Sequence, residues 1–260
     1  AAVPVIPGIK SEAEKFAGAN KSYTIEAMML DTKALQSGTS HNLGQNFAKA
    51  FEIQYLDRNN ELQYAWTTSW GVSTRFVGAI IMSHGDDQGL ILPPRLAPIQ
   101  IVIVPIFKND EDREKVMKVV RSLEKDLTQF RVKVDDRDNL TPGFKFYDWE
   151  LRGVPLRIEI GPKDVEKGSV AFARRDIPGR EGKSFVPRTQ LDGQVAEVLQ
   201  TIQASLHDRA LKFRIDNTSQ PQSLEQLYDI VQKGWAEAWW CGSPDCELKV
   251  KEDTKATTRC

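Results

Sequence analysis

The chain of 260 residues is 40% apolar and 27% charged, with a formal net charge of −1. It can therefore bury one large core or two ordinary ones and is not disordered, and its charge argues against a uniformly basic nucleic-acid coat. No apolar run reaches the roughly 18 residues that a membrane-spanning helix needs.

The two ends of the chain bear on its origin and compartment. The first residues lack both a basic stretch and an initiator Met, so we interpret them as neither a signal peptide nor a natural start. The three cysteines, Cys241, Cys246 and Cys260, all lie in the last 20 residues. An odd number of cysteines at one end is not typical of a secreted disulfide framework, so the expected location is the cytoplasm.

The first part of the chain predicts an α+β arrangement, in which neighbouring strands pair antiparallel and helices are set apart. A hairpin is indicated by two strands that flank the turn at residues 58–60. The expected strands are 23–30, 51–57 and 62–68, and the expected helices are 43–51 and 72–83.

From Pro98 onward, strands and helices alternate, which predicts a small sheet with parallel members and helical cover. Residues 99–104 form a nearly continuous β-branched run, typical of a strand buried on both faces. Further strands are expected at 131–134, 154–160 and 169–174, and helices at 111–127, 144–151, 191–216 and 224–238.

An arginine opens the apolar helix predicted at 72–83. Cations normally avoid the positive end of a helix dipole, so Arg75 is expected to face an anion that the first amides also hold. A guanidinium matches a phosphate bidentately, which a lysine does not. The alternative is a surface ion pair with a neighbouring carboxylate.

Residues 35–47 gather amides, hydroxyls and one imidazole around two glycines, and we interpret them as a loop. Such a loop can hydrogen-bond a polar small molecule from several directions. The alternative, which the local sequence favours, is a helix N-cap in which Ser40 or Asn42 caps the helix at 43–51.

Several strings, in order and spacing, resemble prolyl-tRNA synthetase. They are 36–47 (Gln-x-Gly-Thr-Ser-His-x-Leu-Gly-Gln-Asn-Phe), 68–75 (Thr-Ser-Trp-Gly-Val-Ser-Thr-Arg) and 84–94 (His-Gly-Asp-Asp-x-Gly-Leu-x-Leu-Pro-Pro). The second is similar to motif 3 of class II aminoacyl-tRNA synthetases. The match continues at 137–146, 149–155 and 157–164, so the resemblance covers nearly the whole chain.

The resemblance implies three domains. Residues 1–97 would be the C-terminal part of a catalytic domain with a class II antiparallel sheet. Residues 98–190 would be an α/β anticodon-binding domain, and 191–260 a small C-terminal α+β domain with a partial zinc-type cysteine site. Nothing before residue 70 resembles motifs 1 and 2. No large insertion precedes Gln36, where bacterial-type relatives carry an editing domain, so the implied type is the compact, archaeal/eukaryotic-like one.

The implied activity is the attachment of proline to its tRNA through prolyl-adenylate, with ATP and Mg²⁺, by a homodimeric full-length enzyme. Arg75 would be the catalytic residue. The implied ATP-binding residues are Gln36, Thr39, Ser73 and Arg75, and the implied proline-binding residues are His41, Ser69, Trp70 and Gly71. Because proline has no long polar handle, a close-fitting, partly aromatic cleft must select it by shape. Without motif 2, we expect the 260 residues alone not to form prolyl-adenylate.

Anticodon recognition is the implied role of the middle domain, and residues 152–190 hold nine Lys or Arg against five Asp or Glu. Phe146 would stack on a base, and Glu150, Arg157 and Lys163 would read the two guanines that proline anticodons share. Single-stranded bases are read in this way, by stacking and by hydrogen bonds to their edges. The alternative is that Phe146 and Trp149 are core residues and the charges form a solvated face.

Cys241 and Cys246 lie across a predicted tight turn and supply half of a tetrahedral zinc site. The resemblance implies that longer relatives carry a second cysteine pair beyond them, and that Cys260 is structural. Two other functions remain open. One is a catalytically silent tRNA-binding module, which the joint presence of the ATP-site residues disfavours. The other is a relative that charges a different amino acid, which the strings of the middle domain disfavour.

Overall fold

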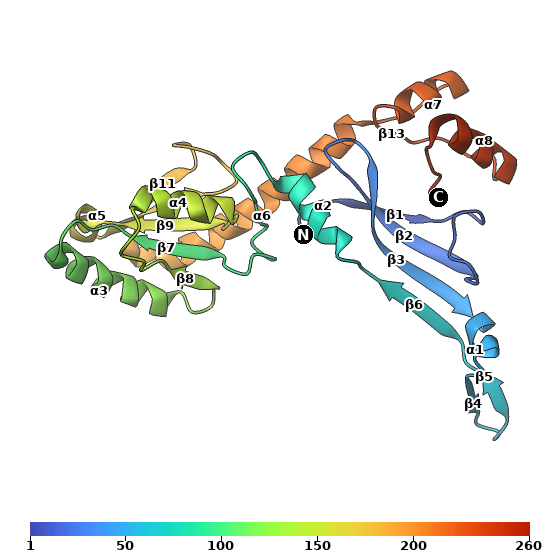
Figure 1. Cartoon of the computed structure of the whole chain (residues 1–260), viewed down its shortest axis with the longest axis horizontal. Helices are drawn as coiled ribbons and strands as arrows, with labels where there is room; N and C mark the ends of the chain where they lie inside the picture. The colour runs from blue at the N-terminus through green and yellow to red at the C-terminus, as the bar shows by residue number, and fades with distance from the viewer. The chain divides into compact units, whose positions relative to one another are not determined.

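The computed structural model describes residues 1–260. They form two compact units, one made of Ala1–Val3 and Ile80–Ala210 and the other of Pro4–Ala79 and Leu211–Cys260 (Figure 1). The borders of these units do not coincide with the domain borders expected near residues 97 and 190, and the three-domain division stays a prediction.

The Pro4–Ala79 part is built on a four-stranded antiparallel sheet in the order β1-β2-β3-β6. Its strands are β1 (Val5–Ile9), β2 (Lys21–Met28), β3 (Ala34–Gly44) and β6 (Thr67–Gly71). Along β2 the buried side chains include Ser22, Thr24 and Glu26, whereas Tyr23 and Ile25 are exposed. One face of this sheet is therefore polar and enclosed. Such a face is suited to binding a polar ligand rather than to packing in a hydrophobic core.

The loop expected at 35–47 is wrong, because most of it is strand β3. This strand pairs with β2 on one side and with β6 on the other, so its backbone groups are satisfied by two ladders. The helix that follows, α1 (Asn46–Ala50), is shorter than expected and has Gln45 at its N-cap without a side-chain hydrogen bond. Neither Ser40 nor Asn42 caps it, since Asn42 Oδ1 accepts from the backbone N–H of Gly44 at 2.9 Å.

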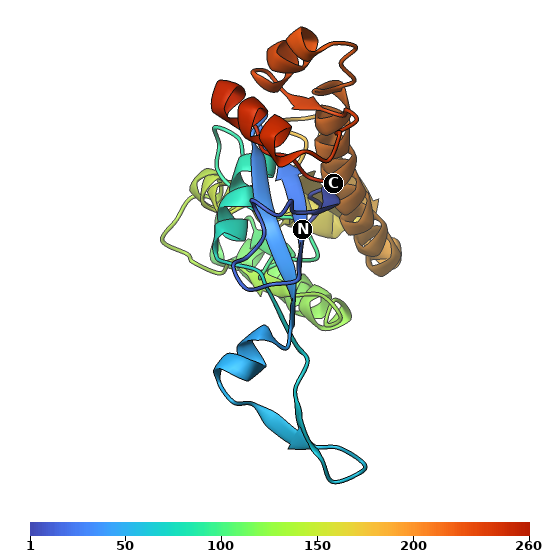
Figure 2. The same cartoon turned by 90° about the vertical axis from the view of Figure 1, so that its right-hand side faces the viewer.

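The predicted hairpin is confirmed as β4 (Gln54–Leu56) paired antiparallel with β5 (Leu62–Tyr64). Asp57 Oδ1 accepts from the N–H groups of Asn59 (2.8 Å) and Glu61 (3.0 Å), which fixes the turn between the strands. Figure 2 shows α1 and the hairpin projecting from the four-stranded sheet.

The Ile80–Ala210 part contains a five-stranded sheet in the order β11-β10-β9-β7-β8. Its strands are β7 (Ile101–Pro105), β8 (Val132–Val134), β9 (Leu156–Ile160), β10 (Ser169–Arg174) and β11 (Lys183–Pro187). β7 is parallel to both β8 and β9, as predicted, whereas β10 and β11 pair antiparallel. The sequence did not predict β11 or the short helix α5 (Pro162–Lys167).

Strand β7 is buried along its whole length because helices cover both faces of its sheet. Ile101 and Ile103 belong to a core cluster with residues of α3 (Asp110–Asp126) and α6 (Leu191–Asp216). Val102 and Val104 belong to another cluster, with Trp149 of α4 (Pro142–Leu151). The predicted helices of this region are therefore confirmed.

The remaining elements are short. They are α2 (Arg75–His84), β12 (Thr218–Ser219), α7 (Leu224–Val231), β13 (Trp235–Ala236) and α8 (Pro244–Thr254). The helix predicted at 224–238 ends early, and β13 then pairs parallel with β12. None of the helices combines the length and the apolar sequence that crossing a bilayer requires.

His84 is a buried histidine at the end of α2. Its Nε2 lies 3.1 Å from the carbonyl oxygen of Ala1, and its Nδ1 has no partner. Burial and, to a lesser extent, the nearby Arg209 guanidinium lower the pKa of His84 to about 4 against the opposing effect of the Ala1 carbonyl. The folded state therefore keeps this imidazole neutral at a pH where an unfolded histidine is protonated.

We expect His84 to make the stability of the chain pH-dependent. Because the folded pKa of His84 is depressed, its stabilising contribution is complete above pH 6.5 and declines as the pH falls towards 4. Between pH 6.5 and 5 the free energy of unfolding should fall by about 1–2 kcal/mol more in the wild type than in His84→Asn. Urea titrations of both proteins at pH 7 and pH 5 measure this difference, and equal losses would contradict it.

Candidate functional site

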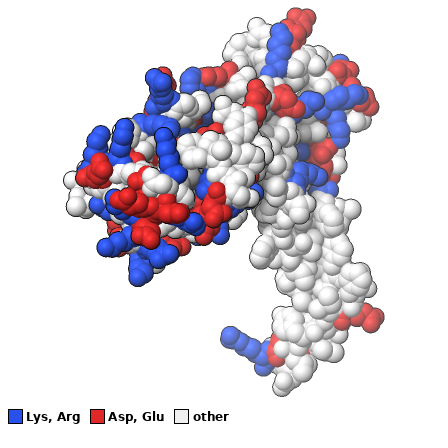
Figure 3. Space-filling view, turned by 60° about the vertical axis from the view of Figure 1, so that its left-hand side comes forward, with Lys and Arg blue, Asp and Glu red and all other residues white.

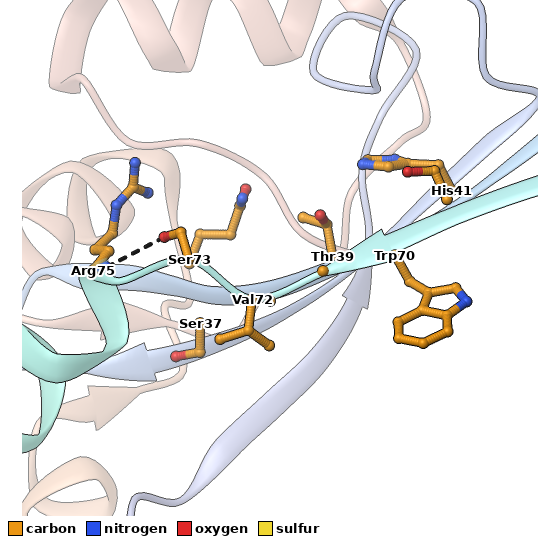
Figure 4. A pocket seen from close by; sticks show the side chains of 11 residues that line it. Ser37, Thr39, His41, Trp70, Val72, Ser73 and Arg75 are labelled. Carbon is orange, nitrogen blue, oxygen red and sulfur yellow. Dashed lines mark hydrogen bonds between the residues drawn. The ribbon is translucent and has the colours of Figure 1, made fainter.

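A cleft of about 320 Å³ lies over β3, β6 and the start of α2. All eight residues expected to bind ATP or proline line it: Gln36, Thr39, His41, Ser69, Trp70, Gly71, Ser73 and Arg75 (Figure 4). Ser37, Gly38 and Val72, which the sequence did not single out, complete the lining. Residues from two separate strings of the sequence thus meet at one place.

The strand register explains how they meet. His41 of β3 is paired with Ser22 of β2 and with Ser69 of β6, which places the three residues in one row across the sheet. The next row on the same face contains Thr39 and Gly71. Because residues directly opposite each other in antiparallel strands share a face, the antiparallel register alone collects these polar groups.

His41 is held by two residues that the sequence did not identify. Ser22 Oγ is hydrogen-bonded to His41 Nδ1 at 2.8 Å, and the Phe16 ring lies 4.9 Å from the imidazole, centroid to centroid. Ser22 Oγ also accepts from the Phe16 N–H at 3.0 Å. These contacts leave Nε2 of His41 as the ring nitrogen available to a ligand. The signal in the sequence was the alternation of polar residues along 21–28.

The aromatic ring of Trp70 does not face the same side of the sheet as His41, although it was expected to form part of the proline cleft. Trp70 is paired with Ser40, in the row between those of His41 and Thr39, so its side chain belongs to the opposite face of the sheet. Figure 4 shows its ring on the other side of the strand from His41, and 77% of the residue is exposed. The aromatic ring that contacts His41 is that of Phe16.

Arg75 is the one charged residue that lines the cleft. It is the first residue of α2, and its backbone N–H donates to Ser73 Oγ at 3.3 Å. No carboxylate lies within ion-pair distance of its guanidinium, so the surface ion pair considered as an alternative is absent from the structure. The exposed guanidinium and the N-terminal end of the helix together favour an anionic ligand.

A second cleft, of about 230 Å³, lies in the Ile80–Ala210 part. Among its lining residues are Trp149 and Glu150 of α4, Arg157 of β9, and Arg174 and Arg175 at the end of β10. On the face that Figure 3 shows, the side chains of Lys and Arg are intermixed with those of Asp and Glu. Five of the nine basic residues of 152–190 form ion pairs with carboxylates: Arg152, Arg157, Arg174, Arg175 and Lys183.

Three of the four residues expected to read the anticodon lie together. Arg157 Nη1 donates to Glu150 Oε1 at 2.8 Å, and its guanidinium carbon is 4.3 Å from the centroid of the Phe146 ring. Arg157 Nε also donates to Glu159 at 3.0 Å. Lys163, the fourth residue, is exposed on α5 and makes no hydrogen bond or ion pair with this group.

Trp149 and Phe146 differ in their surroundings. Trp149 is only 6% exposed, packs with Val102 and Val104, and donates its Nε1–H to Asp135 at 2.8 Å. It is thus a core residue, as the alternative interpretation held. Phe146 packs against the same core but is only partly buried, and Arg157 covers its ring.

The cysteines do not complete a zinc site. Cys241 and Cys246 are exposed and unbridged, and Cys246 lies on α8 rather than in the expected turn. The Ser243 N–H and the Cys246 thiol lower the pKa of Cys241. No three His, Cys, Asp or Glu side chains gather in a geometry that could hold a metal, whereas a structural zinc needs four ligands.

Known proteins are similar to this chain over its whole length. A model described as "Anticodon binding domain" matches residues 100–202, and one described as "Prolyl-tRNA synthetase, C-terminal" matches 224–260. A proline–tRNA ligase of Roseiflexus sp. (strain RS-1) is 58% identical over 260 residues, which are all of this chain and 54% of that protein. A chloroplastic/mitochondrial proline–tRNA ligase of Arabidopsis thaliana is 54% identical over all of this chain and 49% of its own length. The chain spans about half the length of these curated relatives.

Proposed function

Because the chain matches the C-terminal part of the prolyl-tRNA synthetase family over its whole length, we propose that it is the part of a proline–tRNA ligase that holds ATP and proline and reads the anticodon. The observation that carries this proposal is the cleft over β3 and β6. Eight residues from two distant strings share it, and an unpaired arginine lies at one end. A polar sheet face with one free cation suits an amino acid beside a nucleotide.

In the proposed first step, a carboxylate oxygen of proline attacks the α-phosphorus of ATP, which enters with Mg²⁺. A new oxygen–phosphorus bond forms, the bond to the β-phosphate oxygen breaks, and pyrophosphate leaves. Arg75 neutralises the charge of the phosphate tail and of the leaving pyrophosphate, with Gln36, Thr39 and Ser73 lining the nucleotide site. His41 contacts proline, and Ser69, Gly71 and the backbone of Trp70 form a wall of its pocket.

In the second step, a hydroxyl group at the 3′ end of the tRNA attacks the prolyl carbonyl carbon, and AMP leaves. Neither step attaches the substrate to a side chain. Catalysis of this kind rests on positioning the reactants and on stabilising charge that develops in the transition state. The absence of an activated nucleophile from the cleft is consistent with it.

The larger organisation belongs to the same proposal. Residues 1–97 end a class II catalytic domain, 98–190 form the anticodon-binding domain, and 191–260 form the C-terminal domain. The full-length enzyme works as a homodimer in the cytoplasm. Cys241 and Cys246 would contribute two ligands to a zinc site of the full-length protein. Two ligands alone do not form such a site, so no step of the mechanism depends on zinc.

Anticodon reading falls to Phe146, Glu150, Arg157 and Lys163 in this proposal. Arg157 uses Nη1 and Nε in ion pairs, while Glu150 uses only Oε1, which leaves its Oε2 free to accept from the N–H groups of a guanine. Guanine is the base whose Watson–Crick edge offers two such donors side by side. Lys163, which has no partner, is free to donate to O6 or N7 or to a phosphate.

The test is ATP–pyrophosphate exchange by a synthetase that contains these 260 residues. We expect exchange that depends on proline and that alanine does not support, because the cleft is expected to select proline by shape. Tight tRNA binding without any proline-dependent exchange would identify a silent tRNA-binding module instead. Exchange driven by another amino acid would identify a synthetase for that amino acid.

A further inference from the structure

The loop that follows α2 lies along the C-terminal end of α4, where Glu150 is located. The Leu90 N–H donates to the Leu151 carbonyl at 3.0 Å, and the Leu92 N–H donates to the Gly153 carbonyl at 3.1 Å. A Cβ atom on Gly153 (φ +72°) would come within 2.6 Å of Leu90. The loop and the helix end therefore approach each other too closely for any larger residue at this position.

Arg175 joins this loop to the helix end. Its Nη1 and Nη2 donate to the two carboxylate oxygens of Asp86, at 2.9 and 2.6 Å. Its Nε donates to the backbone carbonyl of Glu150 at 3.0 Å. Its own backbone N–H donates to the Pro155 carbonyl at 3.0 Å, so the residue is also fixed to the start of β9.

Because Arg175 is buried, its side chain is confined to these contacts. The Arg175 side chain is only 3% exposed, so its charge depends on Asp86 for compensation. The pKa of Asp86 is lowered mainly by its hydrogen bonds from Arg175, in agreement with a persistent ion pair. Fork-to-fork pairs of arginine and carboxylate fix orientation as well as distance.

The other side of α4 is held separately. Asp135 accepts from Trp149 Nε1 at 2.8 Å and from Arg137, which also donates to Asp148 at 2.9 Å. These bonds fix the inner face of α4 on the sheet, but none of them reaches Glu150. The Glu150 backbone is held at its carbonyl by Arg175, and its carboxylate is held by Arg157.

We propose that Asp86 and Arg175 are positioning residues for anticodon recognition. By fixing the backbone of Glu150, they hold its carboxylate where it can accept hydrogen bonds from a guanine edge. The inference rests on the proposed function, in which Glu150 reads the anticodon. Neither Asp86 nor Arg175 contacts the base in this arrangement. They act through the Glu150 backbone, and they tie its position to the loop that follows α2.

The experiment measures the ratio of two affinities of the chain. One is for a proline tRNA transcript, and the other is for the same transcript with both shared guanines of the anticodon replaced. Asp86→Asn keeps the shape of the side chain and an acceptor for Arg175, but removes the charge. We expect it to lower the ratio about five- to tenfold. A well-aligned base contact gives about tenfold or greater discrimination, and most of this discrimination is lost when the contact is misplaced.

A double-mutant cycle with Glu150→Gln tests whether Asp86 acts through Glu150. We expect Asp86→Asn to have almost no further effect on the ratio in the Glu150→Gln background. Arg131→Gln is the matched control, because Arg131 donates to the backbone carbonyls of Pro94 and Ala97, away from α4. It should leave the ratio unchanged, and thermal unfolding should show that all variants remain folded.

The possible results distinguish failure of the positioning role of Asp86 from failure of the proposed role of Glu150. If Glu150→Gln lowers the ratio and Asp86→Asn does not, the positioning role is wrong and the proposed function stands. If the two effects multiply, Asp86 does not act through Glu150, and the inference is again overturned. If Glu150→Gln itself leaves the ratio unchanged, Glu150 does not read the anticodon, and the inference fails together with that part of the proposed function.

Discussion

Replacing Arg75 by alanine should lower the rate of prolyl-adenylate formation about 10²- to 10³-fold in a synthetase that contains these residues, the usual effect of removing one group that stabilises developing charge. Arg75 is the one charged residue that lines the cleft, and no carboxylate neutralises it. Its loss leaves the phosphate tail without its cation, and no neighbouring side chain replaces it. The measurement is proline-dependent ATP–pyrophosphate exchange at saturating ATP, so that weaker ATP binding does not mask the effect on the rate.

Two variants make this result specific. Arg75→Lys keeps the charge but loses the bidentate fork, so its rate should lie between those of the wild type and Arg75→Ala. Arg58→Ala removes an exposed arginine from the turn of the β4–β5 hairpin and should leave the rate unchanged. Affinity for tRNA should be the same in all of these proteins. Equal losses of exchange and tRNA affinity in Arg75→Ala would mean that the residue is structural.

The elements that the sequence predicted best are those in which burial and periodicity agree. The run at 99–104 reads as a buried strand because it is covered on both faces, and β7 is fully buried. The helices at 111–127 and 191–216 alternate apolar and polar residues at helical spacing. β11 was missed because it is a mostly exposed edge strand, and its one buried residue, Val186, leaves little periodic signal.

Strand β3 shows where local patterns mislead. Its glycines and hydroxyl residues indicated a loop, because strands usually alternate polar with apolar residues. In this sheet the enclosed face is itself polar, because His41 lines a cleft and the buried Ser22 is hydrogen-bonded to it. The polar residues that form the site are thus the same residues that break the polar–apolar alternation by which strand β3 could have been predicted. The resemblance to a family identified His41, and the start of an apolar helix had already singled out Arg75. The partners of His41 required the structure, in which Ser22 lies opposite His41 in the strand register and Phe16 contacts it from outside the strands.

The anticodon group shows a different limit. Glu150 and Arg157 were expected to read bases, and the structure places them 2.8 Å apart in an ion pair. Sequence spacing does not reveal this contact, because it joins the end of α4 to a strand that begins after a turn. The pairing has a consequence for any test of Glu150, since a substitution there also removes one of the two carboxylates that Arg157 contacts.

Replacing Glu150 by glutamine should weaken the binding of proline tRNA about tenfold or more, since a good bidentate base contact is worth roughly 1–3 kcal/mol of discrimination. The substitution keeps the shape of the side chain but turns one acceptor into a donor, which then faces the N–H donors of guanine. Binding of a tRNA with an unrelated anticodon should hardly change. The measurement is a titration of both tRNAs at one fixed salt concentration.

Two controls separate base reading from other effects of the substitution. Glu159→Gln removes the other carboxylate that Arg157 contacts, so it would match Glu150→Gln if loosening of Arg157 were the whole cause. We expect it to have a smaller effect on proline tRNA. Lys167→Ala removes an exposed cation of α5 outside the reading group, and should weaken both tRNAs alike and reduce the salt dependence, as the loss of a phosphate contact does. If Glu150→Gln weakens both tRNAs equally, or neither, then Glu150 pairs with Arg157 for structural reasons alone and the anticodon is read elsewhere.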